Sequence, residues 1–225
     1  MDDKFHLTIE QNIFLAKKVL VSSIYSAAKI EGVNTTYPET ETILDGANVP
    51  TARLDDITVI LNLRDAWRYL LNNVENEEIN LEFIAKINEN VSRNESLDWG
   101  KLRTGEIGIH GTNHKPTVPD ETEVKESLAK IFREKKTVTA KALDAMLFIM
   151  NRQLFWDGNK RTAQLVANAI LISGGAGVLN IREENIGEFN DKLTRFYDTQ
   201  NGEELKKFLY DKCIFGLEAY SEHSS

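Results

Sequence analysis

Apolar residues recur at helical spacing along most of this chain, and this periodicity restricts the fold to a mainly helical one. Between residues 55 and 73, for example, Ile60, Trp67 and Leu70 share one face. Gly32 follows the first apolar stripe and is predicted to end that helix, because glycine readily adopts the conformation of a helix C-terminus. The periodicity predicts helices over residues 9–31, 55–73, 80–91, 121–133, 139–153, 159–173, 183–197 and 202–216.

Two stretches depart from the helical pattern. Residues 100–119 are rich in glycine and proline and alternate around Ile107 and Ile109, which predicts a short β-hairpin. Residues 34–50 are rich in turn-forming residues, with one or two helical turns expected over 38–44. Neither stretch is a convincing linker, so we expect a single domain that spans all 225 residues.

The charge balance and the cysteine content exclude several classes of protein. The net charge of −8 argues against a broad nucleic-acid surface, which requires a basic stripe. The only cysteine, Cys213, excludes a disulfide framework within the chain, and we expect it to be a buried apolar residue. No stretch approaches the roughly 18 apolar residues of a membrane helix, and the first residues lack a secretory signal. We therefore expect a cytoplasmic protein that binds neither nucleic acid nor membrane.

The loop between the fifth and sixth predicted helices carries the strongest chemical signal. Gly158 lets the backbone turn sharply and approach a ligand. The free N–H groups of the following helix start attract an anion. Lys160 and Arg161 add two positive charges, and the Asp157 carboxylate suits a magnesium ion that bridges phosphates. These features predict a nucleotide phosphate site on residues 155–161.

By itself the loop is equally well explained as a turn before a capped helix with two solvated basic side chains. Two distant segments favour the phosphate site. The loop resembles the signature of the Fic family, His-x-Phe-x-Asp/Glu-Gly-Asn-Gly-Arg-x-x-Arg, at Phe155, Asp157, Gly158, Asn159 and Arg161. Further segments resemble the family's flap, inhibitory helix and linking helix, at residues 102–109 with 113–116, at 29–32 and at 54–69 respectively.

The resemblance covers residues 20–175 and implies a Fic-type helical bundle with a short β-hairpin flap near 100–119. Within the single domain, it divides the chain into an N-terminal inhibitory segment, the Fic core and C-terminal helices, at residues 1–50, 51–175 and 176–225 respectively.

Fic proteins commonly transfer AMP from ATP to a hydroxyl group of a target protein. The resemblance therefore implies ATP and Mg²⁺ as cofactors. It assigns the metal to Asp157 and the nucleotide phosphates to Gly158, Asn159, Lys160 and Arg161. The flap would align an extended target segment as an added strand, through Thr112, Asn113, His114 and Lys115.

Two departures from the family signature change what the resemblance implies. Gln153 stands where the family has the histidine that acts as general base, and a glutamine amide cannot take up a proton. A flap histidine, His110 or His114, is the alternative base. Lys160 replaces the second glycine of the turn, as in the Doc branch, whose members transfer phosphate rather than AMP.

A third departure concerns the inhibitory helix. In the family, a glutamate on this helix pairs with the second arginine of the signature and blocks the seat of the γ-phosphate. Here that arginine is Gln164, and the usual serine or threonine four residues before the glutamate is Ala27. Glu31 shares a helical face with Ala27, so we expect it to point inward; the alternative is an exposed glutamate near the helix end. Its expected partners are Arg161, Lys160 or Gln164.

We therefore expect a Fic-like nucleotide-binding protein whose transfer activity is weak or lost because Gln153 replaces the general base. Two other functions stay open. One is an active AMP transferase, or a Doc-like, toxin-type protein kinase, that modifies a target hydroxyl; the other is a non-catalytic interaction scaffold. The expected partners are ATP or another nucleotide, a target protein at the flap, and an antitoxin or a second copy of the chain.

Overall fold

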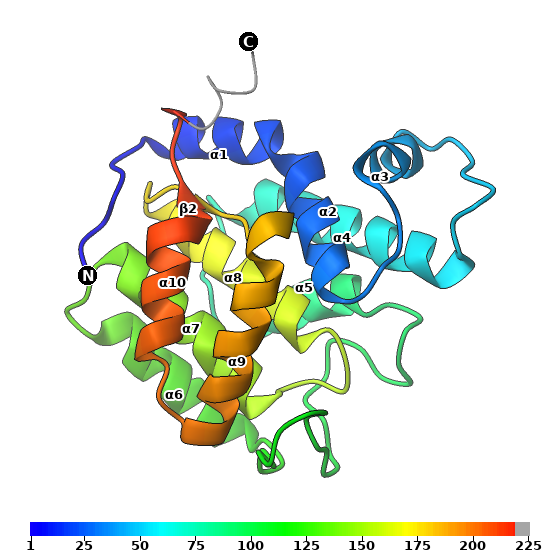
Figure 1. Ribbon diagram of the computed structural model, residues 1–225. Helices are drawn as coiled ribbons and strands as arrows, with labels where there is room; N and C mark the ends of the chain where they lie inside the picture. Colours follow the sequence, from blue (N-terminus) through cyan, green and yellow to red (C-terminus); the bar gives the residue numbers. More distant parts are fainter. Residues whose placement is uncertain (219–225) are drawn as a thin grey trace.

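The computed structural model describes residues 1–218, which form ten α-helices and one small two-stranded sheet (Figure 1). This confirms the mainly helical fold predicted from the periodicity. The helices are α1 (Ile9–Lys18), α2 (Leu20–Ile30), α3 (Tyr37–Leu44), α4 (Leu54–Asn73), α5 (Leu81–Val91), α6 (Glu121–Arg133), α7 (Val138–Arg152), α8 (Asn159–Ser173), α9 (Ile186–Thr199) and α10 (Glu203–Cys213).

Helix α8 is the centre of the fold. Every residue from Arg161 to Ile172 is buried, because α7 packs on one side of it and α4 and α5 on another (Figure 1). Its Val166 belongs to a hydrophobic cluster shared with α7, α9 and α10, whereas its Leu165 belongs to a second cluster shared with α2 and α4. A helix buried all round is fixed by its surroundings, so the first turn of α8 is held firmly in place.

Polar side chains mark the start of five helices within residues 1–218. Each accepts a hydrogen bond from the backbone N–H three residues further along, which satisfies a group that the helix itself leaves unpaired. Because such caps stop a helix at a definite residue, the starts predicted for α5, α6 and α7 lie within one residue of the observed ones. The capping residues are Thr8, Thr36, Asn80, Asp120 and Thr137.

The prediction of one continuous helix over residues 9–31 is wrong in one respect. A bend at Val19, with φ −96° and ψ 10°, separates α1 from α2. The hydrogen bonds still cross the bend, since the Val19 N–H donates to Leu15 O and the Ser23 N–H to Val19 O. The two halves diverge because α1 packs on α8 whereas α2 packs on α3 and α4. Gly32, with φ 82°, follows the end of α2 as predicted.

The hairpin predicted over residues 100–119, called the flap below, contains no paired strands. A turn closed by the Thr112 N–H and Ile109 O reverses the chain. The carbonyl groups of its two arms bind a guanidinium instead of a partner strand. The buried Arg103 side chain donates to Gly105 O at 2.5 Å, Pro116 O at 3.1 Å and Thr117 O at 2.6 Å.

The C-terminal helices also differ from the prediction. The helix expected over 183–197 begins with a 3₁₀ turn at Glu183–Asn185 and continues as α9, and the helix expected over 202–216 ends at Cys213, which is buried as expected. Strand β2 (Ile214–Phe215) then pairs antiparallel with β1 (Val178–Leu179). This pairing ends the helix because the backbone N–H and C=O groups of the strands bind each other instead.

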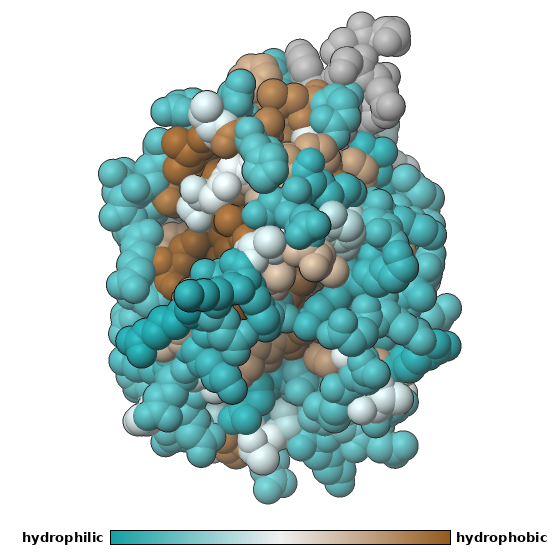
Figure 2. Space-filling view, turned by 90° about the vertical axis from the view of Figure 1, so that its left-hand side faces the viewer, coloured by the Kyte–Doolittle hydropathy of each residue, from teal (hydrophilic) through white to brown (hydrophobic). Residues whose placement is uncertain are grey.

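Residues 1–218 form no continuous apolar belt on the face that Figure 2 shows. Figure 2 views the molecule from the left-hand side of Figure 1, where hydrophilic residues cover most of the face and apolar residues gather mainly in its upper left. Large exposed apolar side chains such as Leu54 and Leu97 lie on different loops and helices. Among residues 1–218, no helix combines the length and the apolar character that crossing a membrane requires.

Candidate functional site

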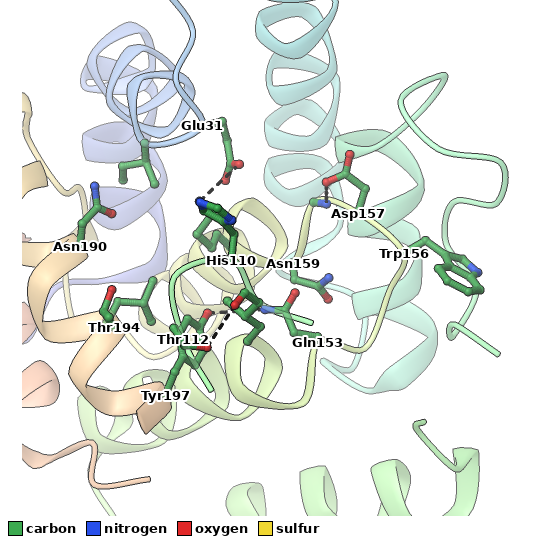
Figure 3. Close-up of a pocket in the computed structure, with 15 residues that line it drawn as sticks. Glu31, His110, Thr112, Gln153, Trp156, Asp157, Asn159, Asn190, Thr194 and Tyr197 are labelled. Carbon is green, nitrogen blue, oxygen red and sulfur yellow. Dashed lines mark hydrogen bonds and ion pairs between the residues drawn. The ribbon is translucent and has the colours of Figure 1, made fainter. Parts of the chain in front are cut away.

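A cavity of about 410 Å³ lies between the end of α2, the flap, the loop at 153–158 and α9 (Figure 3). Segments that are far apart in the sequence therefore build one site. It contains the predicted residues Glu31, Thr112, Gln153 and 157–160, but not Arg161, Asn113, His114 or Lys115. The remaining lining residues are Ile30, Ile109, His110, Trp156, Asn190, Leu193, Thr194 and Tyr197.

The loop before α8 is held in a defined conformation. Gly158 has φ 72°, and a Cβ atom there would lie 2.7 Å from Val91 Cγ1, so both the backbone and the space require glycine. The Asn159 amide closes the loop: its Oδ1 accepts from the Phe155 N–H at 2.9 Å and its Nδ2 donates to Phe155 O at 2.8 Å. Phe155 is fully buried, as expected. From below, the buried Asn88 side chain donates to Asp157 O at 2.9 Å.

The start of α8 differs from the five capped starts, because Gly158 has no side chain to cap it. Within residues 1–218, the Thr162 N–H is the first N–H of this helix that donates to a backbone carbonyl, Gly158 O. Gly158, Asn159 and Lys160 line the cavity. The Asn159 and Lys160 N–H groups, which have no partner within residues 1–218, and the positive end of the helix dipole therefore lie beside open space, an arrangement that attracts an anion.

Arg161 turns away from this cavity into the protein. Its side chain is 2% exposed, and its Nη1 donates to Glu95 Oε1 at 2.9 Å and to Val91 O at 3.1 Å. Burial alone lowers the pKa of Arg161, but the negative charges of Glu31 and Glu95 outweigh it and raise the pKa. The idea of two solvated basic side chains is therefore wrong for Arg161, which is a permanently charged group inside the protein.

Glu31 points inward, with its side chain 19% exposed. Its Oε2 lies 3.5 Å from Lys160 Nζ, and its Oε1 lies 4.0 Å from Arg161 Nε. Oε1 and Nε are both buried without a hydrogen-bond partner. Gln164, the third expected partner, instead donates to Lys160 O within its own helix at 3.3 Å. The carboxylate thus lies across the first turn of α8 and partly neutralises its cations.

Asp157 keeps one face of its carboxylate open. The side chain is 43% exposed, and Oδ1 accepts from the Gly158 N–H at 2.6 Å. No cluster of three or more acidic, histidine or cysteine side chains suited to a metal exists within residues 1–218. A single carboxylate fits Mg²⁺, which proteins commonly hold through one or two carboxylates together with substrate phosphates.

Gln153, which the sequence predicts to stand at the position of the family histidine, lines the cavity. It has φ 45°, and its Nε2 donates to Met150 O at 2.7 Å and lies 3.5 Å from the Tyr197 hydroxyl. Burial, together with the negative charge of Glu31, raises the pKa of Tyr197. Tyr197 therefore presents a protonated hydroxyl to the cavity, and neither it nor Gln153 is a proton acceptor at neutral pH.

The flap is anchored at its tip as well as at its base. The His114 ring lies parallel to that of Tyr197, with Nε2 2.9 Å from Asn151 O and Nδ1 3.2 Å from Gln200 Nε2. The Asn113 N–H donates to Asp198 at 3.2 Å. Both ring nitrogens of His114 therefore have partners, and the residue serves to attach the flap to α7 and α9.

Sequence reasoning missed the wall that α9 contributes. Asn190, Thr194 and Tyr197 lie four and three residues apart, on one face of the helix, and all three line the cavity (Figure 3). The spacing was visible in the sequence, but the signature loop gives no information about which later helix faces it. Glu95 and Asn88, which hold Arg161 and the loop, were missed for the same reason.

Comparison with known proteins agrees with this geometry. The model of the Fic/DOC family matches residues 78–171, from just before α5 to near the end of α8. Over this segment, which is less than half of the chain, the protein is similar to a Fic domain. The matched segment includes the flap, the loop at 153–158 and the uncapped start of α8. No curated protein sequence matches the chain.

Solved structures of Fic proteins share the fold of this chain. Fic-1 from C. elegans aligns with a TM-score of 0.70 and 22% identity over 88% of this chain. The chain spans only 60% of that protein chain. A Fic domain containing signaling protein from Bacteroides thetaiotaomicron gives a TM-score of 0.73 and 17% identity, over 91% of this chain and 85% of its own. A Fic family protein from Desulfovibrio desulfuricans gives 0.73 and 18%, over 96% and 69%.

Proposed function

We propose that this Fic-like domain binds the phosphates of ATP at the start of α8 and transfers part of the nucleotide to target hydroxyl groups only weakly. The observation that carries the proposal is the uncapped helix start beside the cavity. Amide groups of this kind, with Lys160 next to them, favour phosphate oxygens over neutral ligands. Similarity to a family whose members transfer nucleotide monophosphates supports the choice of a nucleotide.

The rest of the cavity supplies groups for a nucleoside. Asn190 and Thr194 are exposed on α9, and Tyr197 adds a hydroxyl donor. Leu193 and Ile109 provide apolar surface between them. A few polar groups on a partly apolar wall are typical of sites for small organic ligands.

Mg²⁺ fits the site only together with the nucleotide. Asp157 is the residue that would hold it, and the ion would supply positive charge to neutralise the phosphate oxygens. Arg161 contributes indirectly in this conformation, because its guanidinium lies 3.6 Å from the Asp157 carboxylate and steadies it.

Weak transfer follows from the residues that line the cavity. Gln153 takes up no proton, and loss of general-base assistance costs about 10²–10⁴ in rate. Glu31 opposes the incoming phosphates by charge and already binds Lys160. A target segment would lie along the flap, whose carbonyls bind Arg103 on the inner side and whose outer edge is open to pairing.

Isothermal titration calorimetry with ATP and Mg²⁺ tests the nucleotide site. Lys160→Ala removes a charged contact and is expected to weaken binding about 10- to 100-fold, since such contacts contribute about 1.5–3 kcal/mol. Lys207→Ala is the matched control, because Lys207 is 76% exposed on α10. Absence of heat at millimolar ATP would leave only the interaction scaffold, whereas equal affinity in both variants would show that Lys160 does not contact the phosphates.

The Doc-like alternative is supported by one residue, Lys160, which stands where AMP transferases of the family have glycine. ATP labelled on its α- or its γ-phosphate separates the two reactions. Transfer of the α-label to protein indicates AMP transfer, and transfer of the γ-label alone indicates a kinase.

A further inference from the structure

The cavity lacks a proton acceptor at the position where the family has one. Gln153 donates its amide N–H to Met150 O, so its side chain is folded back on α7. A transfer reaction in this cavity therefore requires either no base or a base from another element.

The flap is the element best placed to provide that base, because it is fastened on both sides of its turn. At its base Arg103 binds Gln153 O at 2.6 Å in addition to the flap carbonyls, and the Arg103 N–H donates to Leu154 O at 2.9 Å. At its tip the His114 ring binds α7 and stacks on Tyr197. The residues between these anchors are thus held against the cavity.

His110 lies between the two anchors. It lines the cavity together with Asp157 and Lys160, and Figure 3 shows its ring among the other lining side chains. Within residues 1–218 its ring makes no hydrogen bond, whereas both ring nitrogens of His114 are engaged. Of the two flap histidines, only His110 has a nitrogen available to a ligand.

We propose that His110 accepts the proton of the target hydroxyl in the weak transfer reaction, in place of the missing histidine at position 153. This inference rests on the proposed function. The hydroxyl oxygen forms a bond to a phosphorus atom of ATP, and the bond from that phosphorus to its bridging oxygen breaks. The hydroxyl proton moves to the imidazole, and the leaving phosphate group departs with the bond electrons.

The charges around His110 favour this role. Glu31 from α2 and Asp157 from the loop before α8 are negative, whereas Lys160 from α8 is positive and Tyr197 from α9 stays neutral. The two carboxylates exceed the single ammonium group, so the charged side chains that line the cavity with His110 sum to a net negative charge.

The test measures label transfer from ATP and Mg²⁺ to proteins of a cell lysate, with the label on either phosphate. His110→Asn is expected to lower the rate about 10²-fold, because general-base assistance is lost. His6→Asn, at an exposed position in the N-terminal segment, is the matched control and is expected to keep the wild-type rate.

Calorimetry with ATP separates failure of this inference from failure of the nucleotide site. If both variants bind ATP as the wild type does, but His110→Asn keeps the wild-type transfer rate, His110 is not the base. A wild-type protein that binds ATP and labels nothing also overturns the inference and leaves the nucleotide site intact. Loss of ATP binding in the wild type refutes the proposed function itself.

Discussion

The starts of α7 and α8 differ in what binds their first backbone N–H groups, which have no partner within the helix. At α7, Thr137 caps the Ala140 N–H, and the Asp3 carboxylate accepts from the Thr139 N–H at 2.7 Å and the Val138 N–H at 3.3 Å. At α8 the corresponding groups meet glycine and a cavity. The protein thus supplies a carboxylate to the first N–H groups of α7. At the start of α8, Asp157 Oδ1 accepts only from the Gly158 N–H, and the N–H groups of Asn159 and Lys160 bind no protein group within residues 1–218.

The difference teaches what the open start requires. Both helices are 15 residues long and pack against each other, so their dipoles are alike. The anion that satisfies α7 comes from the same chain, which indicates that an anion from solution would satisfy α8.

The largest effect on the free energy of unfolding is expected from Arg161, whose buried charge lies below the start of α8. Arg161→Met would leave Glu95 and Glu31 without their buried partner, and breaking such a pair costs about 3–5 kcal/mol. Urea denaturation measures the free energy of unfolding. Arg195→Met, at a position 64% exposed, is the control and is expected to change it by less than about 1 kcal/mol. Equal effects in both variants would mean that the Arg161 network is not what holds α8.

Gly158→Ala tests the glycine of the open start. The left-handed backbone costs an alanine about 1–2 kcal/mol, and the contact with Val91 adds to this. We expect a lower melting temperature and weaker ATP binding. Gly187→Ala is the control, because a Cβ there meets no atom within 4 Å. A Gly158→Ala protein that binds ATP unchanged would show that the amides of this turn do not contact phosphate.

The start of α7 is also held by Asp144, which binds Lys136 Nζ at 2.7 Å and Lys206 Nζ at 2.6 Å. Burial alone raises the pKa of Asp144, but the two lysines outweigh it and hold the pKa below its usual value. A lowered folded-state pKa adds stability above the unfolded pKa of about 3.9, and this stability is lost as the pH falls through the folded pKa.

Asp144→Asn is therefore expected to lower the free energy of unfolding at pH 7 by about 1–2 kcal/mol, as for hydrogen bonds to charged groups that are partly exposed. The difference from the wild type should shrink as the pH falls below about 3.9. Denaturation curves between pH 2 and pH 7 measure it. A difference that is constant over this range would exclude the charge of Asp144 as its cause.

The smallest effect on the free energy of unfolding is expected at the start of α7, to which Asp3 binds. Asp3→Ala removes the carboxylate from α7 and should cost about 1 kcal/mol, because the Thr137 cap remains. Asp2→Ala, at an exposed neighbouring position, is the control. An Asp3→Ala protein as stable as this control would remove the contrast between the two helix starts.

The sequence predicted those features of the fold and the site whose causes are residues close together in the chain. Caps and apolar spacing predicted most helices, and the glycine loop with its acid and cations predicted where the cavity lies. It failed where a distant group decides the outcome. Nothing near Arg103 shows that its guanidinium replaces a β-ladder in the flap, and nothing near Arg161 shows that Glu95, 66 residues earlier, keeps it inside the protein. The strand at Ile214–Phe215 likewise depends on a partner in β1.

The N-terminal segment that supplies Asp3 has a consequence for biosynthesis. Lys4 Nζ donates to Tyr210 O at 2.9 Å and Ile214 O at 3.2 Å, and the Leu7 N–H donates to Gly175 O. A ribosome adds about 5–20 residues per second, so Lys4 emerges roughly 10–40 s before its partners on α10 and β2. Because α7 and α8 emerge before residue 210, the contacts of Lys4 with Tyr210 and Ile214 form only after the chain of these two helices has been made.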